Sequence, residues 1–551
     1  MVSARRLDTL RDPTAAVQEL YQSSSTFDNF PRLVADHFSN VYQAHNAFQE
    51  IPTLDTQNPP HTFPDGSLVR FRAMVQDTSL SSEMYLSKSK SGNCGGWGIH
   101  DTSEGEEDDR VGVDYADLRE CTVLWAVNVP GESSWYAHAL DGPDTQQERP
   151  PRPTSVVAPI PQFPHKYPNP IAENIGVQVK IYDIERSEAL KATDVVTFVG
   201  ILCSEPCSLN EGAAIDVPTL HVLFTRQDPY NLVRHPENLE SDKKQEDARR
   251  ENLARLREDL ITWIANEALG GDRNVAEWVL LLCIARVQSR NPPLLPPSLT
   301  ISHFPPPPTP STSESISQPS PTLSFILGLL LPLSDTLPLS LASLNEGAFS
   351  PESKNEDLHA GVLQLPQGTV LLVTEGSVRE GKLVERGLMN LHALQEVMST
   401  QTLAYVFPFS QFSFPTDISC IVLSEGTKSA FFKTDLIVPL KSALSPSATV
   451  EPYKPAESVV LPPAEKLTAF RDLLLRARSG KVQVSGPISE YIQSDFVRDR
   501  QQDKAVTSDD LIRRMTIAKL YALSLHETSL TVETWERAKA FDERRRAALR
   551  S

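Results

Sequence analysis

The stretch Ser67-Leu-Val-Arg-Phe-Arg-Ala-Met-Val-Gln76 alternates in character and is rich in residues that favour β-strands. A second run of the same type, Cys121-Thr-Val-Leu-Trp-Ala-Val-Asn-Val-Pro130, follows downstream. Beyond a Pro- and Gln-rich segment at 141–170, strand signals return at 177–182, 195–202 and 219–224. Short strands on both sides of a flexible insertion are compatible with a split OB-like β-barrel within residues 61–230.

A different pattern occupies residues 231–442. Val370-Leu-Leu-Val373 and Cys420-Ile-Val-Leu423 are short apolar runs, typical of strands buried in a parallel sheet. Helical periodicity is expected at 240–265, 275–287, 323–331 and 388–398. Strands that alternate with helices predict an α/β domain, interrupted by a Pro-rich loop at 292–321.

Both ends of the chain have helical character. Residues 1–60 are expected to form a small helical module, and residues 464–551 a helical domain that follows a linker at 443–463. The apolar stretch from Leu323 to Leu331 is too short to span a bilayer and is followed by Pro332, so it predicts a buried helix. The expected fold class is therefore multidomain, with both α and β structure.

Composition narrows the possible functions. The chain has 551 residues, with 52 Lys plus Arg against 71 Asp plus Glu, a formal charge of −19. A protein that grips the phosphate backbone of nucleic acid needs an excess of cations, so this balance argues against such a role. The 44 Pro and only 24 Gly also disfavour a phosphate-cradling enzyme, whose loops need glycine.

The sequence contains no complete motif for metal binding, phosphate binding or catalysis. The pair Cys203 and Cys207 lacks a second ligand pair, so two small apolar residues near a strand end are favoured over a zinc site. Gly376-Ser-Val-Arg-Glu-Gly381-Lys382-Leu383 resembles a phosphate-binding loop but has Leu383 where the Mg²⁺-binding hydroxyl belongs. The acidic segment Glu104–Asp109 is expected to be a solvated loop rather than a docking site for a basic partner. The sequence thus nominates no catalytic, cofactor-binding or metal-binding residue, and it assigns no residue to a partner interface.

Several segments together resemble the mini-chromosome maintenance complex-binding protein family. They are Phe63-Pro-Asp-Gly-Ser-Leu-Val-Arg-Phe-Arg-Ala-Met-Val-Gln-Asp77, Val129-Pro-Gly-Glu-Ser-Ser-Trp135, Leu190 to Leu202, Gly361-Val-Leu-Gln-Leu-Pro366 and Leu423-Ser-Glu-Gly426. The resemblance implies a nuclear, non-enzymatic protein that binds subunits of the replicative minichromosome-maintenance helicase. It also implies roles in assembly, storage or unloading of that helicase from chromatin, in replication and in sister-chromatid cohesion.

The architecture also resembles the helicase subunits themselves, with an AAA+-like α/β domain and a helical lid. In that comparison Ser298-Leu-Thr-Ile-Ser-His303 replaces the strand before the phosphate-binding loop, and Phe304 with four prolines follows. Proline has no amide N–H, so this segment cannot cradle phosphate. Thr374 stands where an Asp would help to hold Mg²⁺, only Glu375 remains, and Asp509 lies near the position of a phosphate-sensing Arg. The resemblance therefore implies a degenerate AAA+-like domain without a nucleotide cofactor.

Two other hypotheses stay open. A nucleotide-using ATPase of this fold would depend on Lys382 or Glu375. A DNA-binding replication factor would use aromatic platforms on the OB-like barrel. The candidates for stacking are Phe71, Trp125, Trp135 and Phe198, for which packing in the core is the favoured interpretation.

Overall fold

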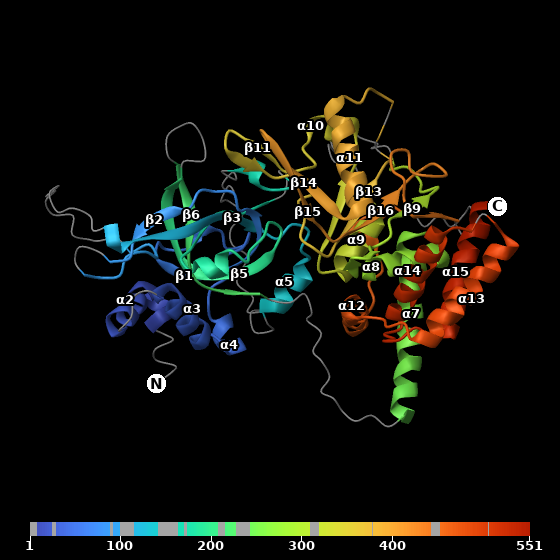
Figure 1. Ribbon diagram of the computed structural model, residues 1–551, viewed down its shortest axis with the longest axis horizontal. Coiled ribbons are helices and arrows are strands. Elements are labelled where there is room, and N and C mark those ends of the chain that lie inside the picture. Colours follow the sequence, from blue (N-terminus) through green and yellow to red (C-terminus); the bar gives the residue numbers. More distant parts are fainter. Residues whose placement is uncertain are drawn as a thin grey trace.

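The computed structural model describes residues 8–24, 29–88, 92–99, 115–141, 163–169, 173–207, 215–227, 243–308, 319–376, 378, 380–441, 452–504 and 506–550. Figure 1 shows two halves along the long axis, a β-barrel with the N-terminal helices below it and an α/β unit joined to the C-terminal helices. The chain is therefore mixed α and β with several sheets, which confirms the predicted class. No described helix is long and apolar enough to cross a membrane.

The N-terminal helices pack against the outside of the barrel. They are α2 (Pro13–Ser23), α3 (Phe30–Val41) and α4 (His45–Gln49). Asp12 begins α2 because its carboxylate accepts a hydrogen bond from the Ala15 amide at 2.9 Å. The buried side chains of these helices join one hydrophobic cluster with Val199, Ile201 and Phe224 of the barrel. The helices and the barrel wall therefore bury their apolar faces against each other.

The barrel is closed by five strands. They are β1 (Ser67–Asp77), β3 (Leu118–Asn128), β4 (Gly176–Ile181), β5 (Val195–Cys207) and β6 (Ile215–Arg226). The order is β1-β5-β6-β4-β3, and pairing of β3 with β1 closes the ring, while β2 (Glu83–Leu86) extends β3. Only the β4–β6 pair is parallel. Where the β5–β6 register shifts and Leu223 of β6 is the extra residue, Gly200 approaches β6 so closely that a Cβ there would meet the His221 carbonyl oxygen at 2.2 Å. The predicted strands are thus confirmed.

The second half is built on a parallel five-stranded sheet. Its strands are β9 (Leu299–Ser302), β10 (Ser334–Pro338), β13 (Thr369–Thr374), β16 (Ile418–Leu423) and β17 (Leu436–Pro439). They lie in the order β10-β13-β16-β9-β17, and every pairing is parallel. Successive residues point to opposite faces, so Leu372 and Leu371 enter different cores. Both faces are covered, which is why the central strands β13 and β16 are largely apolar.

One face of this sheet is covered mainly by helices far apart in the sequence. They are α7 (Lys243–Ala268), α8 (Arg273–Ile284), α9 (Thr322–Leu330), α12 (Ala464–Ser479), α13 (Gly486–Gln502), α14 (Ser508–Ser524) and α15 (Val532–Arg550). They share one hydrophobic cluster with the sheet, in which Trp278 stacks on Phe541 with ring centroids 4.3 Å apart. Because α9 is buried here through residues such as Leu323 and Leu330, its prediction as a core helix is confirmed.

The other face carries α10 (Leu341–Glu346), α11 (Glu385–Thr400) and a small second sheet. That sheet has the order β12-β11-β14-β15, from strands β11 (Glu352–Lys354), β12 (Asp357–His359), β14 (Thr402–Phe407) and β15 (Ser410–Pro415). The remaining elements are the strand pair β7 (Ser289–Arg290) and β8 (Pro293–Leu294), and the short helices α5 (Ser134–Asp141) and α6 (Ile184–Ser187).

The two halves are joined by backbone and side-chain contacts. The Ser133 amide donates to the Pro332 carbonyl, and the Ser334 amide donates to the Gly131 carbonyl, each at 2.9 Å. The indole of Trp135 donates to the Gly328 carbonyl at 3.1 Å, and the Arg471 guanidinium lies 4.2 Å over its ring. These contacts fix the segment after β3 against the loop between α9 and β10.

Two predictions need correction. The segment 141–170 was expected to contain no packed element, but Phe163, Lys166 and Tyr167 at its end are buried, and Phe163 packs edge-on against Trp125. The proline-rich loop 292–321 contains β8 and β9, because its first part pairs with neighbouring strands while residues 309–318 lie outside the described part. The acidic segment Glu104–Asp109 also lies outside it.

Candidate functional site

The strand order of the parallel sheet marks one position for a ligand. The chain leaves β9 toward β10 at one edge, whereas it leaves β16 toward β17 on the other side. In open α/β sheets, ligands bind beyond the carboxyl ends of the strands where the connections diverge in this way. The position beyond the carboxyl ends of β9 and β16, here called the crevice between β9 and β16, is therefore where a nucleotide would be expected.

The protein's own backbone fills this crevice. The amide of His303 donates to the Gly426 carbonyl at 3.0 Å, and the amide of Phe304 donates to the Ser424 carbonyl at 2.9 Å. These amides directly follow β9, where a phosphate-binding loop would need free N–H groups. The hydroxyl of Tyr453 donates to the Pro305 carbonyl at 3.0 Å and holds the next residue as well. Among the residues that the structure describes after β9, the crevice thus offers no open cradle for phosphate.

The proline segment also closes the crevice sterically. Pro307 packs onto Gly376, where a Cβ would meet the Pro307 Cδ at 2.8 Å. Phe304 is buried and lies edge-on against Tyr453, with ring centroids 5.9 Å apart. The prediction that Ser298–His303 forms the strand before this segment agrees with the position of β9.

Glu375, at the end of β13, has a structural role. Its carboxylate accepts hydrogen bonds from the Ser429 hydroxyl at 2.5 Å and from the Ala430 amide at 3.1 Å. Both Glu375 and Ser429 are buried, and the Ser429 Oγ also accepts from the Phe432 amide. The carboxylate therefore pins the loop between β16 and β17. Lys382, the other residue of the ATPase hypothesis, lies in the segment before α11, where its carbonyl accepts from Asn345.

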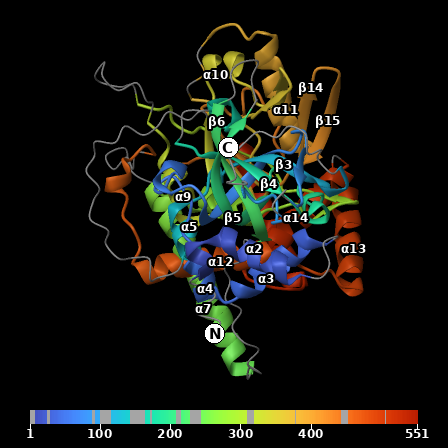
Figure 2. The ribbon, with the colours of Figure 1, turned by 90° about the vertical axis from the view of Figure 1, so that its left-hand side faces the viewer.

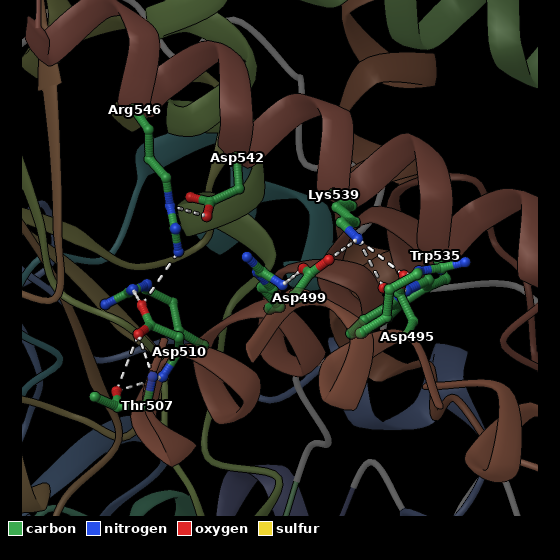
Figure 3. A network of polar contacts seen from close by, with 11 residues as sticks. Asp495, Asp499, Thr507, Asp510, Trp535, Lys539, Asp542 and Arg546 are labelled. Atoms are coloured by element: carbon green, nitrogen blue, oxygen red, sulfur yellow. Dashed lines mark hydrogen bonds and ion pairs between the residues drawn. The ribbon is translucent and has the colours of Figure 1, made fainter. Parts of the chain in front are cut away.

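The C-terminal helices contain a polar network in which the cations face carboxylates (Figure 3). Asp510 caps α14 together with Thr507 and also pairs with Arg513 and Arg546. Burial opposes its ionisation, but the Thr507 hydrogen bonds and the two guanidinium charges outweigh this and lower the pKa of Asp510. The sequence suggested Asp509 as the residue near a phosphate-sensing position, but Asp509 is exposed and its neighbour is the one that bonds.

A second part of the same network centres on Asp495, which is 1% exposed. It accepts from the Trp535 indole at 3.1 Å and from the Lys539 ammonium at 2.9 Å. Lys539 also pairs with Asp499 at 3.0 Å, and Arg514 pairs with that carboxylate at 2.5 Å (Figure 3). Ion pairs of Lys539 and Arg514 with Asp495 and Asp499 thus join the C-terminal helices α13, α14 and α15.

The aromatic residues of the barrel lie in its core. Phe71 and Phe198 are 0% exposed and Trp125 is 1% exposed, so these rings present no surface to a base. The basic residues of β1 are engaged as well. The Arg70 guanidinium donates to the Ile51 carbonyl at 3.0 Å, and Arg72 pairs with Glu132 at 2.9 Å. The core-packing interpretation is confirmed for these three rings.

A buried ionic cluster joins the barrel to the α/β unit. The Lys166 ammonium, 1% exposed, bonds Asp77 at 2.8 Å and also bonds Asp357. His165 Nε2 lies 2.7 Å from the other oxygen of Asp357, and its ring lies 4.3 Å from that of His359. Asp77 ends β1, Lys166 lies near the end of the insertion 141–170, and Asp357 begins β12. The cluster therefore ties three distant parts of the chain.

The Lys166 ammonium offsets part of the carboxylate charge in this cluster. Burial opposes ionisation of Asp357, but the His165 hydrogen bond and the Lys166 charge outweigh it, so the pKa of Asp357 is lowered. Burial and the neighbouring His165 lower the pKa of His359. Ligand atoms of His165, Asp357 and His359 lie within 4.8 Å of one another, a spacing that a metal ion could occupy. The Lys166 ammonium already bonds the Asp357 carboxylate, so it competes with a metal ion for that ligand. Among the described residues, Cys203 and Cys207 belong to no such group.

Sequence reasoning located the modified crevice but missed the ionic cluster and the exposed hairpin of β14 and β15. The sequence locates the crevice because four prolines closely follow the strand-like run Ser298–His303. Lys166 lies in a segment of linker-like composition, and no local pattern reveals its distant partners. The hairpin did carry a signal, the alternating Tyr405-Val-Phe407 and Phe412-Ser-Phe414.

Comparison of the sequence with known proteins assigns the chain to a family. The profile of the mini-chromosome maintenance replisome factor family matches residues 38–159 and 144–549. A mini-chromosome maintenance complex-binding protein of Arabidopsis thaliana is 25% identical over 98% of this chain and 99% of its own length. Proteins of the same name from Gallus gallus and Homo sapiens are 25% and 24% identical, each over 98% of both chains. Because the profile covers nearly the whole chain, this protein belongs to the mini-chromosome maintenance replisome factor family.

Proposed function

We propose that this protein is a non-enzymatic binding protein of the mini-chromosome maintenance helicase complex. Its relatives carry a name that states this binding, and they match along almost their full length. We further propose that it acts in the nucleus, where it would regulate assembly, stability or unloading of the helicase during replication and support sister-chromatid cohesion. Association with chromatin would then be indirect, through the helicase.

The proposal includes a structural rationale, mimicry of a helicase subunit. The closed barrel with one parallel strand pair is compatible with an OB fold, and the parallel sheet with helices on both faces is compatible with an AAA+ domain. We propose the corresponding division into 1–60, 61–230, 231–442 and 464–551, with a linker at 443–463. A protein with the outline of a subunit could occupy an intersubunit surface without hydrolysing ATP.

The observation that carries the proposal is the filled crevice between β9 and β16. The His303 and Phe304 amides are bonded to Gly426 and Ser424, and Glu375 is bonded to Ser429 and Ala430. These groups would have to leave their present partners before they could contact phosphate or Mg²⁺. A binding role explains why the α/β domain is retained while its nucleotide position is occupied by the chain itself.

The test mixes the purified full-length protein with each helicase subunit separately and follows co-elution by size-exclusion chromatography. At least one subunit should co-elute with it in the absence of nucleotide. If no subunit forms a complex, the proposal is wrong. Calorimetric titration with ATP and Mg²⁺ separates the ATPase alternative, which requires binding that is lost in Lys382→Ala or Glu375→Gln.

A DNA-binding function is the other alternative. Burial of Phe71, Trp125 and Phe198 and the engagement of Arg70 and Arg72 weigh against it. Near the C-terminus Arg545 is 5% exposed and pairs with Asp542, and Arg546 pairs with the same carboxylate. These two arginines are therefore engaged with Asp542 at the end of α15, which disfavours them as contacts for DNA phosphate. Salt-sensitive binding of single-stranded DNA in a mobility-shift assay would revive this alternative.

A further inference from the structure

The hairpin of β14 and β15 exposes an aromatic surface. Phe409 at its turn is 102% exposed, Phe412 is 54% exposed and Phe414 is 43% exposed. No charged residue occurs from Gln401 through Thr416, although the chain as a whole carries a formal charge of −19. Figure 2 shows this hairpin at the edge of the molecule, beside α11. Exposed apolar patches of this kind mark interaction surfaces more often than they serve stability.

The base of the hairpin is held rigidly. The Gln401 amide nitrogen donates to the Val397 and Ile418 carbonyls, both at 2.8 Å, and its amide oxygen accepts from the Ile418 amide at 2.7 Å. The Arg290 guanidinium donates to the carbonyls on both sides of the hairpin, Gln401 at 3.1 Å and Thr416 at 2.5 Å. The exposed phenylalanines are thus presented on a preorganised support, which lowers the entropy lost on binding.

The outer strand β15 is an open sheet edge. It ends the order β12-β11-β14-β15, and within the described part of the chain it pairs only with β14. Phe407 faces Ser410 across a two-residue turn, and such a closing pair exchanges hydrogen bonds. Hydrogen-bonded and non-hydrogen-bonded pairs alternate along an antiparallel ladder. The backbone N–H and C=O groups of Gln411 and Ser413 therefore point away from β14. An added strand would find hydrogen-bonding partners at those two residues.

One face of this edge is aromatic. Phe412 and Phe414 are two residues apart and therefore point to the same face. Phe414 lies edge-on against Tyr405 with ring centroids 4.8 Å apart, and Phe412 lies in the same way against Phe407 at 5.9 Å. A strand added beside β15 would place alternate side chains next to this row, which favours apolar residues at those positions.

We propose that β15 is the docking edge for an extended, uncharged and apolar segment of a helicase subunit, which adds to the small sheet as a fifth strand. The identity of the partner rests on the proposed function. The chemistry of the segment follows from the hairpin, because an edge without charges gains nothing from a charged strand and would desolvate it at a cost. Nucleic acid fits poorly, because the hairpin offers no cation for phosphate.

The test compares variants in the co-elution assay and by titration with the subunit that binds. Phe409→Ser should weaken binding at least tenfold without affecting the fold, because the ring makes no buried contact. Gln411→Pro with Ser413→Pro should weaken binding at least as much, because proline removes the outward N–H groups and is tolerated on an edge strand. Ile512→Gln on α14, also an exposed apolar position at 55%, is the matched control and should bind like the wild type.

The outcomes separate the two proposals. If the wild type binds a subunit and the Phe409 and double proline variants bind equally well, the assignment of β15 is wrong while the proposed function stands. If the wild type binds no subunit, the proposed function fails and the partner named here fails with it. A wild-type dimer that Gln411→Pro converts to monomer, or DNA binding that Phe409→Ser abolishes, would also overturn the assignment. In the complex, the outward-pointing amides of Gln411 and Ser413 should gain protection from hydrogen exchange.

Discussion

Replacement of Lys166 by Met tests whether the buried ionic cluster holds the two halves together. The ammonium is 1% exposed and bonds two carboxylates, Asp77 at 0% and Asp357 at 2% exposure. Met fills a similar volume but leaves both carboxylates without their shared cation. Removal of one partner from a buried pair typically costs about 3–5 kcal/mol, because the remaining charge is desolvated and unpaired.

A surface pair gives the control. Lys466 and Asp259 are also 2.8 Å apart, but their side chains are 41% and 53% exposed. Solvent screening limits such a pair to about 0–1 kcal/mol, and the Lys466 ammonium adds a weak contact 5.8 Å from the Phe470 ring. Lys466→Met should therefore cost at most about 1 kcal/mol. The two ion pairs have the same 2.8 Å distance, but Lys166 is buried and bonds a second carboxylate, whereas Lys466 is exposed and pairs with one.

Native-state amide hydrogen exchange measures the effect locally. A loss of about 3–5 kcal/mol raises the exchange rate of residues 163–169 roughly a hundredfold to several thousandfold. Exchange in α12 of the Lys466→Met protein should rise by roughly fivefold at most. If residues 163–169 of Lys166→Met exchange within about fivefold of the wild-type rate, the cluster does not hold the interface and the reasoning fails.

Three further predictions concern other parts of the molecule. The pKa of His359 is lowered by burial and by His165, so just below about pH 6.5 the unfolded chain binds more protons than the folded protein. The free energy of unfolding should therefore fall as the pH decreases through this range. Urea unfolding at several pH values should show this slope, and His359→Gln should flatten it. Glu375→Ala should destabilise the α/β domain by about 1–3 kcal/mol because the Ser429 hydroxyl and the Ala430 amide lose their acceptor. A loss of nucleotide binding without a change in the urea midpoint would contradict the structural role. Thr507→Ala removes the side-chain cap of α14 and should cost about 1 kcal/mol, measurable by thermal unfolding, whereas Thr507→Ser should be nearly neutral.

The sequence predicts most elements where local pattern and tertiary environment agree. The apolar run in β13 reflects its two buried faces. Strand β1 is also buried on both faces, although its sequence alternates, because Arg70 bonds the Ile51 carbonyl and Arg72 pairs with Glu132. Strand β10, Ser334-Asp-Thr-Leu-Pro338, was missed because its residues disfavour strands. Pairing with β13 overrides that preference, and its position at the sheet edge tolerates the proline.

The candidate functional site likewise contains some features that the sequence predicts and others that it does not. The loss of N–H groups after β9 can be deduced from the prolines alone. The pairing of the remaining His303 and Phe304 amides with Gly426 and Ser424 cannot, because these partners are distant in the chain. The same holds for Lys166, whose partner Asp77 is 89 positions away. Contacts of this kind depend on topology, and no window of sequence contains both members.

The filled crevice between β9 and β16 limits the ways in which release of a bound partner could be controlled. A ligand shifts a conformational equilibrium only by the difference in its affinity for the two states. Nucleotide cannot enter this crevice without displacing the backbone that occupies it, so nucleotide bound there cannot time a cycle of capture and release. Release would instead be set by events on the partner, by a competing binder or by concentration, and the protein would behave as a buffer rather than as a motor.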